Sequence, residues 1–256
     1  MAWKTAAEIR DVARTPGSVL VIPVGSIEQH GTHLPVATDT VLVSNVSTRA
    51  AERSDIPILC APPVWSGYSP HHLPFGGTLT GEFDTLKSLL EEVATSGLEN
   101  GFDGVVFVNG HGGNTALIDA TVTTIGRRHP AVDVLGLTYF DLATDAVTEV
   151  RDSDVGGMGH GGEFETSLML HLTPELVRTD ALDGTDHDEP YSRGPKDLLD
   201  GGDVSVYRTF DEYSESGAIG DPTLATAEKG EILFDRIVAE LADQFAEVHR
   251  QTEPAA

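Results

Sequence analysis

The chain has 256 residues, enough to bury the core of one large α/β domain. Its 16 basic residues face 41 acidic ones, which gives a formal net charge of −25 and a surface that repels nucleic acid. No apolar run is long enough to span a membrane, and no basic-then-apolar leader begins the chain. We therefore expect neither a nucleic-acid nor a membrane partner. A single cysteine, Cys60, cannot form an internal disulfide, which favours a cytoplasmic location.

The acidic residues are spread through amphipathic, aliphatic-bearing segments and do not form a tail. This distribution predicts a folded surface adapted to high salt, and hence a halophilic source. The net charge therefore indicates a high-salt environment and says little about the substrate.

Short β-branched runs alternate along the chain with segments that carry apolar residues at helical spacing. Strands are expected at residues 18–24, 56–61, 104–108 and 132–137, and helices at 40–53, 82–98, 114–128, 163–172 and 226–250. This alternation predicts an α/β fold with a mostly parallel sheet covered on both faces. We expect a single domain over 1–256, with a core at about 18–245 and a loop-rich excursion at about 180–222.

Metal-ligand residue types follow two of the expected strands. Ligand sites in parallel sheets collect at the carboxyl ends of strands. Glu28 and His30 come just after the first strand, and in an extended segment both side chains point the same way. His111 follows the strand at 104–108, and Asp39 begins a helix. Carboxylates and imidazoles bind divalent ions. A solvated loop, a structural histidine and a helix N-cap at Asp39 are the competing interpretations.

A second group of such residues surrounds the expected helix start near Glu163. Negative side chains are stabilised at a helix N-terminus, which alone would explain both Glu163 and Glu165. In the functional interpretation, Glu165 binds metal and His160 moves protons; helical spacing does not decide which glutamate faces the site. The Gly112-Gly113 turn could instead cradle a phosphate, which leaves a non-catalytic nucleotide-binding module as the alternative from another class.

Several separated strings, in order, resemble the creatininase family (creatinine amidohydrolase-like proteins). They are Glu28-Gln29-His30-Gly31-Thr32-His33-Leu34-Pro35 with Asp39, Asn109-Gly110-His111-Gly112-Gly113-Asn114 and Gly162-Glu163-Phe164-Glu165-Thr166-Ser167. Residues 67–78 and 220–226 look like the family too, so the resemblance covers roughly residues 18–245.

The resemblance implies a three-layer α/β/α sandwich and metal-dependent hydrolysis of a non-peptide C–N bond in a small molecule, a cyclic amide or a formamide. It implies one or two divalent ions (Zn, Fe or Mn) and a homo-oligomer, the hexamer being typical of creatininases. Matching positions give Glu28, His30, Asp39, His111 and Glu165 as metal ligands, and His160 with Glu165 as catalytic residues. In this mechanism, metal-activated water attacks the carbonyl carbon and His160 gives a proton to the leaving nitrogen.

Two departures from true creatininases affect the substrate. Those enzymes carry a ligand glutamate where this chain has Gly113, so either one ion binds or Glu165 takes over. They also place tryptophans around the substrate, and none lies between residues 130 and 180 here, which disfavours creatinine amidohydrolase.

The Asn-Gly-His-Gly-Gly-Asn form is more similar to two other branches of the family. Our first prediction is an archaeal-type deformylase of a formylaminopyrimidine nucleotide in flavin and deazaflavin biosynthesis. Arg151, Arg193 and Arg208 are candidates to bind its phosphate. A mycofactocin-precursor-type peptidase is the runner-up.

Overall fold

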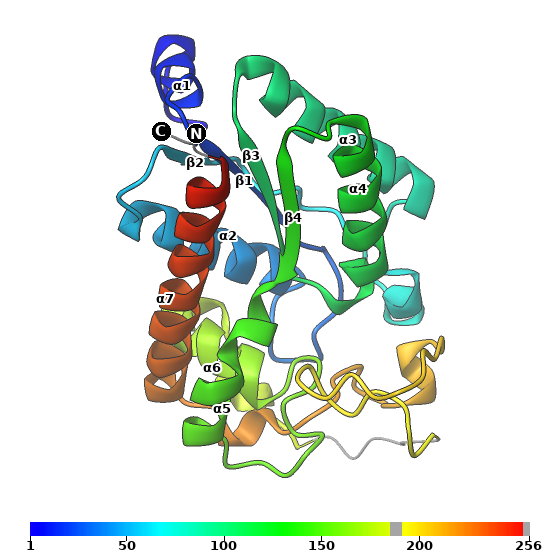
Figure 1. The fold of residues 1–256 in the computed structure, drawn as a ribbon. Coiled ribbons are helices and arrows are strands. Elements are labelled where there is room, and N and C mark those ends of the chain that lie inside the picture. Colours follow the sequence, from blue (N-terminus) through cyan, green and yellow to red (C-terminus); the bar gives the residue numbers. More distant parts are fainter. Residues whose placement is uncertain (185–190, 253–256) are drawn as a thin grey trace.

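The computed structural model describes residues 1–184 and 191–252 (Figure 1). Four parallel strands form one sheet in the order β2-β1-β3-β4. The strands are β1 (Val19–Val24), β2 (Ile58–Cys60), β3 (Gly104–Asn109) and β4 (Asp133–Thr138). The α-helices of the described residues are α1 (Ala6–Ala13), α2 (Thr38–Arg53), α3 (Phe83–Asn100), α4 (Thr115–Arg128), α5 (Thr144–Val150), α6 (Glu163–Leu172) and α7 (Ala227–Thr252).

The central strands β1 and β3 pair over six residues, from Val19 opposite Gly104 to Val24 opposite Asn109. Every residue of both strands is buried. Strands buried on both faces are typical of parallel sheets, because helices cover each side. The loops that leave β1 and β3 therefore begin side by side at the middle of the sheet.

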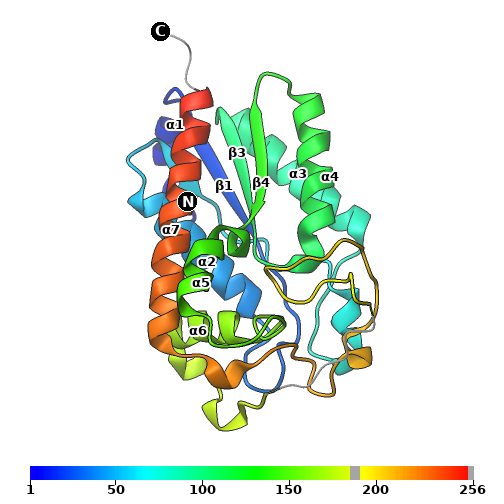
Figure 2. The same cartoon turned by 60° about the horizontal axis from the view of Figure 1, so that its bottom comes forward.

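Alternate residues of these strands enter two separate hydrophobic clusters. One cluster joins Val19, Val21, Val106 and Val108 to α2, α6 and α7. The other joins Leu20, Ile22, Val105 and Phe107 to α3 and α4. Figures 1 and 2 show these helices on opposite sides of the sheet. The predicted three-layer α/β/α sandwich with a parallel sheet is confirmed.

Two helices, α1 and α5, fall outside the predicted set. In the predicted excursion, residues 185–190 lie outside the described residues, and the rest carries only short 3₁₀ turns such as Phe210–Glu212. No helix in residues 1–184 and 191–252 is long and apolar enough to cross a membrane. A single domain over 1–256 stays a prediction.

Candidate metal centre

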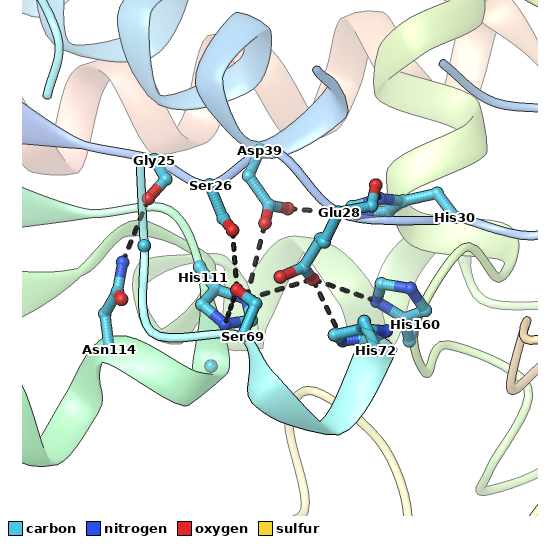
Figure 3. Close-up of polar contacts among 12 residues, drawn as sticks. Gly25, Ser26, Glu28, His30, Asp39, Ser69, His72, His111, Asn114 and His160 are labelled. Carbon is cyan, nitrogen blue, oxygen red and sulfur yellow. Dashed lines mark hydrogen bonds and ion pairs between the residues drawn. The ribbon is translucent and has the colours of Figure 1, made fainter. Parts of the chain in front are cut away.

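The predicted metal ligands converge at the carboxyl end of the sheet, where Figure 3 shows Glu28, His30, Asp39 and His111. Glu28 and His30 lie on the segment that leaves β1, and His111 on the one that leaves β3. Asp39 and Glu165 lie in the first turns of α2 and α6. All five side chains are at most 5% exposed. The fold therefore joins three distant parts of the chain in one buried cluster.

One group of possible ligands consists of Glu28, Asp39 and His111. His111 Nδ1 lies 3.1 Å from Glu28 Oε1 and 3.3 Å from Asp39 Oδ2. Two ligand atoms that each lie about 2.1 Å from a shared Zn²⁺ are themselves about 3.0–3.4 Å apart. These three side chains are spaced as ligands of one ion would be.

The other oxygen of Asp39 faces His30, which belongs with His160 and Glu165 to a second group of possible ligands. Asp39 Oδ1 lies 3.0 Å from His30 Nε2, and His30 Nε2 lies 3.7 Å from Glu165 Oε1. A carboxylate with one oxygen in each group is placed to bridge two ions. The N-cap interpretation of Asp39 is wrong, because the N-cap of α2 is Ala37 and no side chain caps it.

Three carboxylate oxygens of the cluster lack a hydrogen-bond donor in the part of the chain that the structure describes. Among the described residues, neither oxygen of Glu28 nor Asp39 Oδ2 has a hydrogen-bond partner. Burial opposes ionisation of Glu28, but its contacts with His111 and His72 outweigh that effect and hold the pKa of this carboxyl well below its usual range. A buried carboxylate is costly unless a cation or donor compensates it. The donor set therefore fits a divalent ion.

In its neutral form, each of three histidines would present a nitrogen lone pair to this centre, because a backbone carbonyl contacts the other ring nitrogen. Carbonyl oxygens only accept, so the contacting nitrogen carries the hydrogen. His30 Nδ1 lies 3.1 Å from Glu28 O, and His111 Nε2 lies 3.2 Å from Tyr68 O. His160 Nε2 lies 2.5 Å from Gln29 O. The free nitrogens are those that face the carboxylates.

His160 differs from the two predicted ligand histidines in charge. Burial, with the neighbouring His30 and His72, lowers the pKa of His160 well below its usual value. Its Nδ1 lies 3.7 Å from Glu28 Oε1. A neutral imidazole with a free lone pair beside the centre is suited to accept a proton.

Burial opposes protonation of His111, but Glu28 and Asp39 raise its pKa to about 10. Burial likewise opposes protonation of His30, which Asp39 and Glu165 outweigh, so the pKa of His30 lies well above its usual value. The centre is thus a region of strong negative potential that attracts cations.

Comparison with known proteins decides the family. The family model described as creatinine amidohydrolase (Creatininase) matches residues 2–245. The chain belongs to the creatininase family. It is 35% identical over 230 residues to the mycofactocin precursor peptide peptidase of Mycolicibacterium smegmatis, covering 88% of this chain and 83% of that protein. It is 32% identical over 250 residues to the creatinine amidohydrolase of Pseudomonas putida, covering 90% and 89%.

Solved creatininases share the fold. A structure described as creatininase Mn has a TM-score of 0.83 at 28% identity, covering 99% of this chain and 98% of that one. A creatininase mutant of the Zn-Zn type has a TM-score of 0.83 at 27% identity, covering 99% and 98%. The predicted resemblance is confirmed, and the chain is a hydrolase of this family that acts on carbon–nitrogen bonds. Membership of a hydrolase family does not fit the alternative prediction of a non-catalytic nucleotide-binding module.

The departure from creatininase at Gly113 has a steric basis. A Cβ at Gly113 would overlap His111 Nε2 and would lie 2.6 Å from Tyr68 O and 2.9 Å from His71 Cε1. A glutamate therefore cannot occupy this position unless His111 moves. Glu165 faces His30 and is placed to supply an acidic ligand to the second group.

Three side chains around the centre were not among the predicted site residues: Gln29, Ser69 and His72. Ser69 Oγ lies 3.0 Å from His111 Nε2 and holds its ring in place. His72 Nε2 lies 3.2 Å from Glu28 Oε1. Residues 67–72 belong to the strings that resemble the family, and this resemblance could have marked Ser69 and His72 as site residues. The spacing of these residues, however, does not indicate a set of metal ligands.

Proposed function

We propose that the chain is a metal-dependent amidohydrolase with two adjacent metal positions. Glu28, Asp39 and His111 would hold one ion, and His30, Asp39 and Glu165 the other. The observation that carries this proposal is Asp39, whose two oxygens each lie within 3.3 Å of a ligand nitrogen of a different group. Zn and Mn are the ions named for the solved creatininases, and Fe stays in the predicted set. When bound, a divalent ion supplies a Lewis acid and lowers the pKa of water.

His160 is proposed to move the proton. Its Nδ1 carries the lone pair that faces the centre, so it takes a proton from the attacking water and passes it to the leaving nitrogen. This extends the predicted donor role of His160, since the same atom accepts first. Gln29 O keeps the ring in the required tautomer.

For the substrate, we propose a short peptide whose amide bond reaches the centre. The support is the 35% identity over 88% of this chain to an enzyme named mycofactocin precursor peptide peptidase. The same name recurs for relatives in Mycobacterium ulcerans and Mycobacterium tuberculosis. This substrate differs from our first prediction, a formylaminopyrimidine nucleotide, and corresponds to the runner-up, a mycofactocin-precursor-type peptidase.

The formamide nucleotide stays a prediction with weaker support. Two of the three arginines suggested for its phosphate already have partners. Arg151 binds Asp197 at 2.6 Å, and Arg193 binds Asp203 at 2.8 Å. Arg208 lies 5.9 Å from the rings of Tyr191 and Tyr213 and is the one left with a loose carboxylate contact, 3.6 Å to Glu212.

The test is a substrate panel on purified protein of known metal content. The panel holds the M. smegmatis mycofactocin precursor peptide, a formylaminopyrimidine nucleotide and creatinine, with products identified by mass spectrometry. We expect cleavage of the peptide and two ions per chain. Release of formate from the nucleotide alone would overturn the peptide proposal, and protein that takes up no metal would overturn the metal centre.

The predicted homo-oligomer and cytoplasmic location stay expectations, as does the absence of nucleic-acid and membrane partners. The predicted small-molecule substrate is replaced by the short peptide proposed above. Light scattering in molar KCl measures the oligomer directly.

A further inference from the structure

The amide of Gln29 has only one possible orientation. Its Oε1 accepts from the N–H of Gly31 at 2.9 Å, and its Nε2 donates to the carbonyl of Gly217 at 2.9 Å. If the side-chain oxygen and nitrogen of Gln29 changed places, two hydrogen-bond donors would face each other at Gly31 and two acceptors would face each other at Gly217. These two backbone groups of fixed polarity therefore assign the oxygen and the nitrogen.

This orientation fixes the tautomer of His72. Gln29 Nε2 lies 2.7 Å from His72 Nδ1, and an amide nitrogen only donates. His72 Nδ1 must therefore accept, which leaves the ring hydrogen on Nε2. His30, His111 and His160 have a carbonyl behind the ring, whereas His72 has a donor there. The ring nitrogen of His72 that faces the centre therefore carries a hydrogen, whereas the neutral rings of the other three carry a lone pair there.

The N–H of His72 points into the centre. Nε2 lies 3.2 Å from Glu28 Oε1, an oxygen without a hydrogen-bond partner among the described residues. The ring is 1% exposed and packs against His160, with centroids 4.4 Å apart, and Phe210, at 4.2 Å. A donor is thus held rigidly beside His160.

We propose that His72 is a catalytic residue that donates this hydrogen bond to the substrate carbonyl oxygen as negative charge develops on it. It keeps its proton throughout, while His160 on the neighbouring ring transfers one. Donors that are fixed before the reaction stabilise a developing oxyanion at little reorganisation cost, and a neutral imidazole can serve as one. This inference rests on the proposed hydrolase function.

The rival role for His72 is that of a metal ligand, since Glu28, His72 and His160 also lie within ligand distance of one another. A ligand nitrogen needs a lone pair, so Nε2 would have to lose its hydrogen while Gln29 still donates to Nδ1. The two roles therefore predict different tautomers and different metal contents.

The tautomer is measured first, by long-range ¹H–¹⁵N correlation on Zn-loaded and metal-free protein. We expect the Nε2–H pattern for His72 in both. Gln29→Leu should disturb that pattern, and His129→Gln, at the C-cap of α4 away from the centre, should not. A deprotonated Nε2 or a Zn-shifted signal would overturn the proposal.

Two substitutions then test the role. His72→Leu should lower kcat about 100-fold with KM changed less than about threefold and with the metal content of the wild type. His72→Gln, which can place an N–H near Nε2, should recover at least about tenfold. Loss of metal in His72→Leu, or a kcat equal to that of the wild type, would contradict the donor role.

A probe that needs no substrate separates this inference from the proposed function. Inorganic phosphate is a tetrahedral oxyanion, and we expect His72→Leu to weaken its binding to the Zn-loaded protein about tenfold, and His72→Gln less. If the wild type cleaves no member of the panel but shows this loss, the substrate proposal fails and the donor stands. Equal phosphate affinity in all three proteins would contradict the donor.

Discussion

Glu163 and Glu165 lie two residues apart in the first turn of α6 and face opposite surroundings. Glu165 Oε1 is directed at the centre, 3.7 Å from His30 Nε2, and its Oε2 accepts from the N–H of Gly161. Glu163 instead binds Lys229 at 2.5 Å and accepts from the backbone N–H of Asp152 and Ser153, each at 3.0 Å. Residues two apart on a helix do not share a face. One glutamate is therefore placed for chemistry and the other for stability.

Glutamine substitutions should separate these two roles. Glu165→Gln is expected to weaken metal binding about 10-fold or more, because a charged oxygen is lost from the second group. Glu163→Gln is expected to keep the metal but to lower the free energy of unfolding by about 2 kcal/mol, since hydrogen bonds to a charged group are lost. Metal titration and denaturant unfolding measure the two effects. Equal metal loss in both variants would refute the assignment.

Asp39→Ala should abolish both metal binding and turnover, because Asp39 contacts both groups. Removing both ions from the wild type with a chelator should give the same inactive state, reversed by added Zn²⁺ or Mn²⁺. Asp119→Ala, at an exposed position of α4, is the matched control and should behave like the wild type. A normal rate in the Asp39 variant would rule out a metal centre here.

Gly113→Glu should not restore the ligand that creatininases carry at this position. The new Cβ would displace His111, so we expect about 10-fold weaker metal binding or more. Gly113→Ala should show most of the same loss, because the overlap already begins at Cβ. Gly112→Ala is the control, since nothing lies within 4 Å of a Cβ there. Tighter metal binding in Gly113→Glu would show that the loop can rearrange.

His33 should make the protein sensitive to mild acid. Burial, opposed by the backbone of Gly161 and assisted by His30, lowers the pKa of His33 to about 4. The unfolded chain takes up a proton near pH 6.5 and the folded chain does not, so stability falls as the pH drops from 6.5 to 4. We expect His33 to contribute on the order of 2 kcal/mol to this loss. His33→Gln should flatten the pH dependence of the unfolding free energy, and His129→Gln should leave its slope unchanged.

The charge of −25 should make stability depend on salt. Repulsion between acidic side chains is screened over about 3 Å at 1 M salt and about 10 Å at 0.1 M. We therefore expect Tm to rise by about 10 °C or more between 0.1 and 2 M KCl. An equal rise in sucrose of matched osmolality would indicate a general solvent effect and contradict the halophilic prediction.

The sheet and its long helices could be predicted because their residues carry strong local signals. β1 and β3 are continuous apolar runs, and α7 has a long apolar stripe. The short helices α1 and α5 were missed. For α1 a signal existed, since Thr5 and Glu8 form a capping box, whereas α5 has only seven residues and no side-chain cap.

The ligand-type residues could be found from their place after strands and from the family motifs. The direction of Glu165 could not, because it depends on which way α6 is rotated against α7. Nor could the role of His72, which depends on the amide of Gln29 and, through it, on the carbonyl of Gly217 far along the chain. Contacts of this kind exist only in three dimensions.

The order in which the centre's residues occur along the chain affects its biosynthesis. Glu28 is made early, but its group gains His111 only after β3, and the second group gains Glu165 only at α6. The nascent chain can therefore hold no complete pair of metal positions until α6 has left the ribosome. α7, which packs on α2 and α6, comes later still. Capture of the second ion would then be a late event in folding, and a fragment that ends before α6 should purify without it.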